Sequence, residues 1–147
     1  MTARLIGYWA TTALIVLETL AGGVADLAQG RTMVVAGTPV VDVVTGLGYP
    51  AYVLKILGTW KLLGAIAVLA PRCPRLKEWA YAGILFHLTG AAASQAARRH
   101  SVGQIMTPVV LAGLALASWA LRPPSRVLRG TAPSRAAGSA LSVLLVP

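Results

Sequence analysis

The sequence predicts an all-α integral membrane protein: a four-helix transmembrane bundle with a short amphipathic helix in the first external loop. Two observations point to this class. Hydrophobic residues make up 56% of the 147 residues, and charged residues only 12%, whereas about a quarter of a typical soluble domain is charged. The apolar residues also fall in long blocks, and each block has about the 17–25 residues that cross a bilayer.

Four helices are predicted, over about residues 5–28, 51–70, 78–97 and 105–121. They must be helices because a backbone that crosses lipid satisfies its own hydrogen bonds. Glu18 and Asp26 interrupt the first block and no clean Ala-x-Ala site follows, so we interpret it as a retained helix rather than a signal peptide. These helices form one domain, residues 1–122. The composition of the remaining residues, 123–147, predicts a disordered basic tail.

The loop between the first two predicted helices contains TPVVDVVTGLGYP. Thr38 suits a helix N-cap, Pro39 suits the first helical position and Gly48 suits the C-terminal cap. Apolar residues repeat between them at helical spacing, at Val40, Val43, Val44 and Leu47. The pattern predicts a short amphipathic helix on the outer face. It either caps the bundle, which we favour, or forms a lid over a cavity that opens outward.

Basic residues cluster between the apolar blocks and after the last one. With four spans, one side of the membrane holds eight of them: Arg4, Arg72, Arg75, Lys77, Arg122, Arg126, Arg129 and Arg135. The other side holds three: Arg31, Arg98 and Arg99. The positive-inside rule therefore predicts a multi-pass membrane protein with both termini in the cytoplasm. The same rule explains the net charge of +9, so we expect no nucleic-acid partner.

Three titratable residues fall near the middle of their predicted helices, Glu18 in the first, Lys61 in the second and His87 in the third. A charge at the bilayer centre costs about 2.5–3.5 kcal/mol on insertion scales. We therefore predict that these residues face one another, with a Glu18–Lys61 ion pair and His87 hydrogen-bonded beside it. The cluster either fixes the helix register or lines a path for a substrate, an ion or a proton.

A second polar layer is predicted nearer the outer face. Asp26 lies about 12 Å along the axis from Glu18, and Lys55 lies about 9 Å from Lys61 in the same direction. Asp26 and Lys55 either form an ion pair, or Lys55 extends to the lipid headgroups. Trp60 lies too deep for an interfacial aromatic belt, so it is either core or an aromatic wall of a ligand cavity.

The sequence contains no pattern that assigns a catalytic residue or a metal site. Cys73 is the one cysteine, which excludes dithiol chemistry within the chain. An unreactive thiol is the default for such a residue. The two histidines, His87 and His100, match no metal-binding spacing. No cofactor is expected to be bound covalently or by a known motif, and the pattern leaves enzymatic activity undecided.

Five blocks carry a family resemblance: YWATTALIVLETLAGGVADL, LGYPAYVLKILGTWKLLGAIAVLAP, PRLKEWAYAGILF, LTGAAAS and ALASWALRPPSR. In this order they resemble the DoxX-like family of small four-helix bacterial membrane proteins, over about residues 5–126. The family is related to DoxX, the small membrane subunit associated with thiosulfate:quinone oxidoreductase. Glu18 and the Trp60–Lys61 pair match its pattern. Similar members often carry an acidic residue in place of His87 and a histidine in place of Gln95.

The resemblance implies a quinone- or redox-associated membrane subunit, with a quinone as ligand and a membrane oxidoreductase or a second copy of the chain as partner. The Glu18, Lys61 and His87 cluster would then relay protons. Two alternatives stay open. One is a carrier or binding module for a small molecule, an ion or a lipophilic ligand. The other is a structural or assembly protein, for which joint replacement of Lys61 and Glu18 by Met would be nearly silent.

Overall fold

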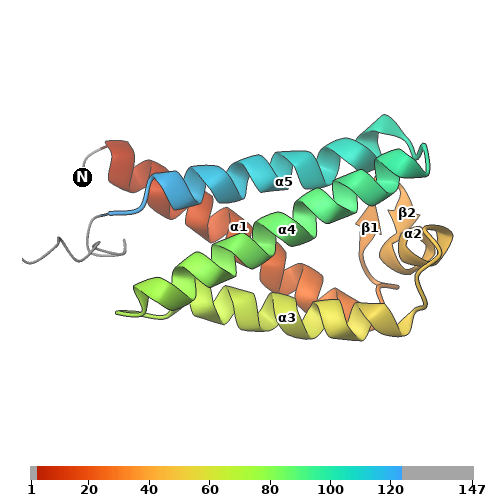
Figure 1. Ribbon diagram of the computed structural model, residues 1–147, viewed down its shortest axis with the longest axis horizontal. Coiled ribbons are helices and arrows are strands. Elements are labelled where there is room, and N and C mark those ends of the chain that lie inside the picture. The colour runs from red at the N-terminus through yellow and green to blue at the C-terminus, as the bar shows by residue number, and fades with distance from the viewer. Residues whose placement is uncertain (1–2, 124–147) are drawn as a thin grey trace, which may run out of the picture.

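The computed structural model describes residues 3–123 and is helical apart from one short β-hairpin (Figure 1). The tail predicted over residues 123–147 lies outside the described residues, apart from Pro123. Four long helices correspond to the four predicted blocks: α1 (Ala3–Leu27), α3 (Tyr52–Leu69), α4 (Pro74–Ala97) and α5 (Val102–Ala120). Between α1 and α3 lie the strands β1 (Val34–Val35) and β2 (Thr38–Pro39) and the short helix α2 (Val40–Gly46).

The four long helices pack around a common interior. Helix α1 lies against α3 and α5, and α4 also lies against α3 and α5. The start of α1, the α3–α4 turn and the end of α5 share one end of the molecule, which we call the terminal end (Figure 1). The hairpin, α2 and the α4–α5 turn share the opposite end, which we call the hairpin end.

Three helices of the described chain, α1, α3 and α5, are long and apolar enough to cross a membrane. Helix α4 has 24 residues and reaches about 36 Å at about 1.5 Å per residue. It carries charged residues near its first turn and Gln95 near its last, so it is less apolar. The structure thus identifies three candidate spans where the sequence predicted four. Large apolar side chains on all four helices point outward, as in a protein that faces lipid, among them Leu17, Trp60, Phe86 and Val110.

Helices α1 and α3 approach closely at a pair of glycines. A Cβ added to Gly58 would lie 2.7 Å from the carbonyl oxygen of Gly23, and one added to Gly23 would lie 3.2 Å from the carbonyl oxygen of Gly58. Small residues allow such backbone contact between helices in lipid. This contact sets the spacing of the two helices and places Lys61, three residues after Gly58, against α1.

A polar network closes the terminal end. The hydroxyl oxygen of Ser118 lies 2.7 Å from Thr12 Oγ1 and 2.8 Å from Tyr81 Oη, and all three side chains are buried. Buried polar groups are tolerated when they are hydrogen-bonded. These bonds join α1, α4 and α5.

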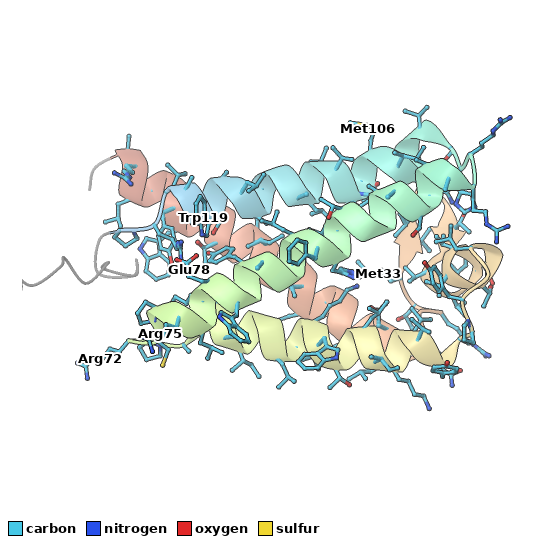
Figure 2. The ribbon with its side chains drawn as sticks, viewed as in Figure 1. Met33, Arg72, Arg75, Glu78, Met106 and Trp119 are labelled. Carbon is cyan, nitrogen blue, oxygen red and sulfur yellow. The ribbon has the colours of Figure 1, made fainter. Side chains whose placement is uncertain are left out.

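Glu78 extends the polar network at the terminal end. Arg122 Nη2 donates to Glu78 Oε1 at 2.8 Å, and Trp119 Nε1 donates to Glu78 Oε2 at 2.8 Å. Figure 2 shows Glu78 and Trp119 close together at this end, with Arg72 and Arg75 at the α3–α4 turn. The end of α5 is therefore fixed to the start of α4.

The helix predicted after Thr38 is present as α2, but its start differs. Thr38 is not the N-cap: it pairs with Val35 in the hairpin, and Pro39 takes the N-cap position. The helix starts later than predicted because the backbone of Thr38 is extended and paired in the hairpin. The C-cap is Leu47, one residue before the predicted Gly48. Gly48 follows it with a left-handed φ of 94°, and its N–H donates to the Thr45 carbonyl at 2.9 Å.

Candidate functional site

A cavity of about 1000 Å³ lies between the long helices toward the hairpin end, and we call it the first cavity. Its walls are mainly apolar and come from α1, α2, α3, α4, α5 and the hairpin; Met33 lines it beside the hairpin and Met106 lines it from α5. Ligand sites typically combine such apolar walls with a few polar groups. The acidic, basic and amide side chains in the lining are Glu18, Asp26, Lys61, His87 and Gln95.

Lys61 forms an ion pair with Asp26, not with Glu18 as predicted. Lys61 Nζ lies 2.8 Å from Asp26 Oδ2, and the side chain of Asp26 is only 1% exposed. Side chains on a helix lean toward its N-terminus. Because α1 and α3 run in opposite directions, Lys61 and Asp26 lean toward each other, whereas Glu18 leans away. The prediction counted residues along each helix to find the depth of Lys61, but it did not take the lean of the side chains into account.

Glu18 and His87 nevertheless lie beside the ion pair. A Cβ added to Gly22 would lie 3.3 Å from Lys61 Nζ and 3.5 Å from Glu18 Oε1. Gly22 thus leaves room for the ammonium to lie along α1 between Glu18 and Asp26. His87 lines the cavity from α4. We call Glu18, Asp26, Lys61 and His87 the polar cluster.

Lys55 and Trp60 do not belong to the polar cluster. Lys55 is exposed and pairs with no acidic residue of the described chain within 4 Å, so the Asp26–Lys55 pair is wrong. At about 100° per residue, six residues turn Lys55 about 120° away from Lys61 around α3. Trp60 is 67% exposed, which excludes a core position. It lines a second cavity instead.

Gln95 is a site residue that the sequence analysis noted only as a departure from a family pattern. Its side chain is buried, and within residues 3–123 its Oε1 finds no hydrogen-bond partner. Asp26 Oδ1 is buried and unpartnered in the same way. A buried polar group without a partner costs about 1–3 kcal/mol. Both side chains line the first cavity, where a bound polar group would satisfy them.

The second cavity, of about 450 Å³, lies between α3 and α4 with α1 behind it. Glu18, Lys61 and His87 line both cavities. Apart from these three residues and Thr19 its walls are formed by apolar residues and glycine. Three residues of the polar cluster therefore stand where the two cavities meet.

The hairpin and α2 cover the first cavity at the hairpin end. Three hydrogen bonds tie this segment to α4 and to the start of α5. Arg98 Nη2 donates to the Leu47 carbonyl at 3.1 Å, Gln104 Nε2 donates to Thr38 Oγ1 at 3.4 Å, and the hydroxyls of Tyr49 and Ser94 lie 3.5 Å apart. The arrangement fits a lid on the cavity as well as a cap on the helices.

Removing the Arg98 bond is expected to loosen this cover. In Arg98→Gln, amide hydrogen exchange over residues 38–50 should rise about two- to tenfold, because one such bond contributes about 0.5–1.5 kcal/mol. Arg99→Gln is the matched control, since Arg99 is the exposed neighbour and no side-chain bond joins it to the cover. Equal exchange in the two variants would show that Arg98 does not hold the cover.

Within residues 3–123, no three His, Cys, Asp or Glu side chains gather closely enough to hold a metal ion. Cys73 is exposed and lies at the α3–α4 turn, away from the polar cluster. The site therefore offers one ammonium, two carboxyl groups, one imidazole and one amide, set in apolar walls. This set can donate and accept hydrogen bonds and can exchange protons.

The comparison with known proteins gives one result. A model of the DoxX-like family matches residues 10–118 of the chain. No curated protein and no solved structure matches it. The matched range contains every residue of the polar cluster, together with Gln95 and the hairpin and α2 that cover the first cavity.

Proposed function

The chain is a membrane protein of the DoxX-like family, and we propose that it binds a quinone-class molecule at the polar cluster as part of a redox-associated assembly. One observation carries the proposal. The buried carboxylate of Asp26 holds the Lys61 ammonium, 2.8 Å away, at the wall of a cavity that is otherwise largely apolar. The charge is thereby available to a ligand head group, and the walls suit a lipophilic body.

The donor and acceptor groups of the site fit both forms of a quinone. Carbonyl oxygens of the oxidised form accept hydrogen bonds, and Lys61 and His87 can donate them. Hydroxyl groups of the reduced form donate hydrogen bonds, and Asp26 Oδ1 and Gln95 Oε1 are buried acceptors without partners. When bound, a quinone supplies the transfer of two electrons and two protons. Glu18, between the two cavities, can hold or release a proton beside Lys61.

We also propose that all four long helices span the bacterial cytoplasmic membrane with both termini in the cytoplasm. The terminal end carries Arg4, Arg72, Arg75, Lys77 and Arg122, and such an excess marks a cytoplasmic face. The charged residues of α4 near Pro74 lie at this end, where headgroups and water can solvate them. In this orientation the hairpin and α2 lie on the outer face.

The electrons must come from another protein. The sequence has a single cysteine and no recognised haem, flavin or iron–sulfur motif, so the chain would supply a ligand site and a proton path. A membrane oxidoreductase is therefore the partner that we propose as the source of electrons. A second copy of the chain is an alternative contact partner, but it would bring no electron source of its own. The exposed apolar faces of the helices leave room for either contact.

Quinone binding can be measured by isothermal titration calorimetry of decylubiquinone against the protein in detergent. Replacing the ion pair as a unit, in Asp26→Leu with Lys61→Met, should weaken Kd about ten- to a hundredfold. The physical reason is that a hydrogen bond to a charged group contributes about 1.5–3 kcal/mol. Asp42→Asn, at an exposed acidic residue of α2, should leave Kd unchanged. Absence of saturable binding to the unaltered protein would reject the quinone assignment.

A further inference from the structure

We propose that the ligand reaches the polar cluster sideways from the lipid, through the second cavity between α3 and α4, and that its hydrocarbon chain stays there when the head group is bound. The inference rests on the function proposed above and adds the route and the shape of the ligand. The ligand is a small polar head joined to an apolar chain, and the chain leaves the protein between two helices.

The first argument is the position of the polar cluster between the two cavities. Glu18, Lys61 and His87 line both of them, and so do Leu57 and Leu88. A head group at Lys61 is therefore next to the second cavity as well as the first. A chain attached to that head can leave through the second cavity without crossing the core of the protein.

The second argument is where the second cavity opens. Four of its lining side chains are among the exposed apolar residues of α3 and α4: Trp60, Leu63, Leu76 and Trp79. Trp79 is 81% exposed. Since α3 is apolar and long enough to cross a membrane, the rim formed by Trp60 and Leu63 faces hydrocarbon, whereas Leu76 and Trp79, at the start of α4, lie toward the headgroups. An apolar rim around an apolar cavity favours a hydrocarbon chain over a soluble metabolite.

The third argument is the space between α3 and α4. Gly64 and Gly83 line the second cavity, and a Cβ added to either would meet nothing within 4 Å. A glycine inside a helix costs about 0.5–1 kcal/mol relative to alanine. At Gly23 and Gly58 that cost is offset by close helix contact. At Gly64 and Gly83 no such contact exists, and the glycines keep the space between the helices open.

The alternative route, through the hairpin end, is covered. The hairpin and α2 line the first cavity there, and Arg98, Gln104 and the Tyr49–Ser94 contact hold them. At the terminal end the Thr12–Ser118–Tyr81 network is closed. Between α3 and α4, Lys77 Nζ donates a hydrogen bond to the Val68 carbonyl near the terminal end. Gly64 and Gly83 lie farther along the two helices, toward the polar cluster.

Photocrosslinking of a quinone that carries a diazirine at the end of a ten-carbon chain tests this route. The full-length protein in lipid nanodiscs is irradiated with the probe, and adducts are mapped by mass spectrometry. We expect adducts on residues of the second cavity, such as Leu63, Leu76 and Trp79, and competition by excess decylubiquinone. Gly83→Leu should lower these adducts at least fivefold, because the added side chain fills the space between α3 and α4.

Two control variants make the outcomes distinct. Gly113→Leu adds the same side chain to α5 at a site that lies in neither cavity and has nothing within 4 Å, and it should leave the adducts unchanged. Gly64→Leu repeats the block from α3 if Gly83→Leu fails to fold. Competed adducts around Met33 and Met106, unaffected by both blocking variants, would overturn the lateral route while leaving quinone binding intact. If no adduct is competed by decylubiquinone, the proposed function fails as well.

Discussion

Replacing Asp26 by Asn should lower the free energy of unfolding by about 3 kcal/mol. Removing one partner of a buried ion pair costs about 3–5 kcal/mol, because the other charge is left buried without compensation. We expect the lower value because the Lys61 side chain keeps 18% exposure and Glu18 remains near its ammonium. Unfolding in mixed micelles by added SDS, followed by circular dichroism, gives this quantity.

The comparison with Glu18→Gln identifies the partner of Lys61. Glu18 has no ion pair within 4 Å in the described chain, so we expect Glu18→Gln to cost clearly less than Asp26→Asn. Asp26→Leu combined with Lys61→Met should recover most of the stability, since replacing a buried pair by apolar residues is often neutral. A larger loss in Glu18→Gln than in Asp26→Asn would restore Glu18 as the partner and contradict the observed geometry.

Gly58→Ala should destabilise the protein by about 1–3 kcal/mol, as overpacking of a close contact does. The added Cβ would lie 2.7 Å from the Gly23 carbonyl oxygen and 3.0 Å from Asp26 Cβ, and neither the backbone of α1 nor the buried Asp26 can yield cheaply. The two helices would have to separate, which lengthens the Lys61–Asp26 distance. Thermal unfolding in detergent, monitored by circular dichroism, should show a lower Tm.

Gly64→Ala is the matched control on the same helix. Its Cβ would meet nothing within 4 Å, and alanine favours a helix over glycine by about 0.5–1 kcal/mol. We therefore expect an unchanged or slightly higher Tm. If Gly58→Ala and Gly64→Ala gave the same Tm, the Gly23–Gly58 contact would not determine the spacing of α1 and α3.

Hydrophobic block length was sufficient to predict the helices. Each long apolar block overlaps one observed helix, and the capping pattern from Pro39 to Gly48 located α2. Start positions were less accurate: α4 begins at Pro74, four residues before the predicted start, because a proline suits the first turn and charged side chains can sit at a helix end. The strand pairing of Thr38 depends on a hairpin that no local pattern indicated.

Depth along the helix predicted part of the site and missed its pairing. Counting residues from the middle of each block was enough to bring Glu18, Lys61 and His87 together. Choosing between Glu18 and Asp26 required the lean of each side chain and the space left by Gly22, which depend on helix direction and packing. The sequence also contained a signal for Gln95. Gln95 is an amide in an otherwise small and apolar stretch, GAAASQAA, and such a residue in a membrane helix requires a partner.

The two ends of the molecule differ in how their buried polar groups are hydrogen-bonded. At the terminal end every hydroxyl of the Thr12–Ser118–Tyr81 network has a partner. Toward the hairpin end, Asp26 Oδ1 and Gln95 Oε1 do not. Two unsatisfied buried acceptors in the lining of one cavity indicate a place where a ligand completes the structure.

The most direct test of ligand binding is mass spectrometry of the small molecules that copurify with the protein in mild detergent. The unaltered protein is compared with the Asp26→Leu, Lys61→Met variant after both are shown to fold by circular dichroism. We expect a defined lipophile with a polar head, a quinone above all, in the native sample and its loss from the variant. Identical bulk-lipid profiles in both samples would contradict a ligand site at the polar cluster and would leave the ion pair with a structural role alone.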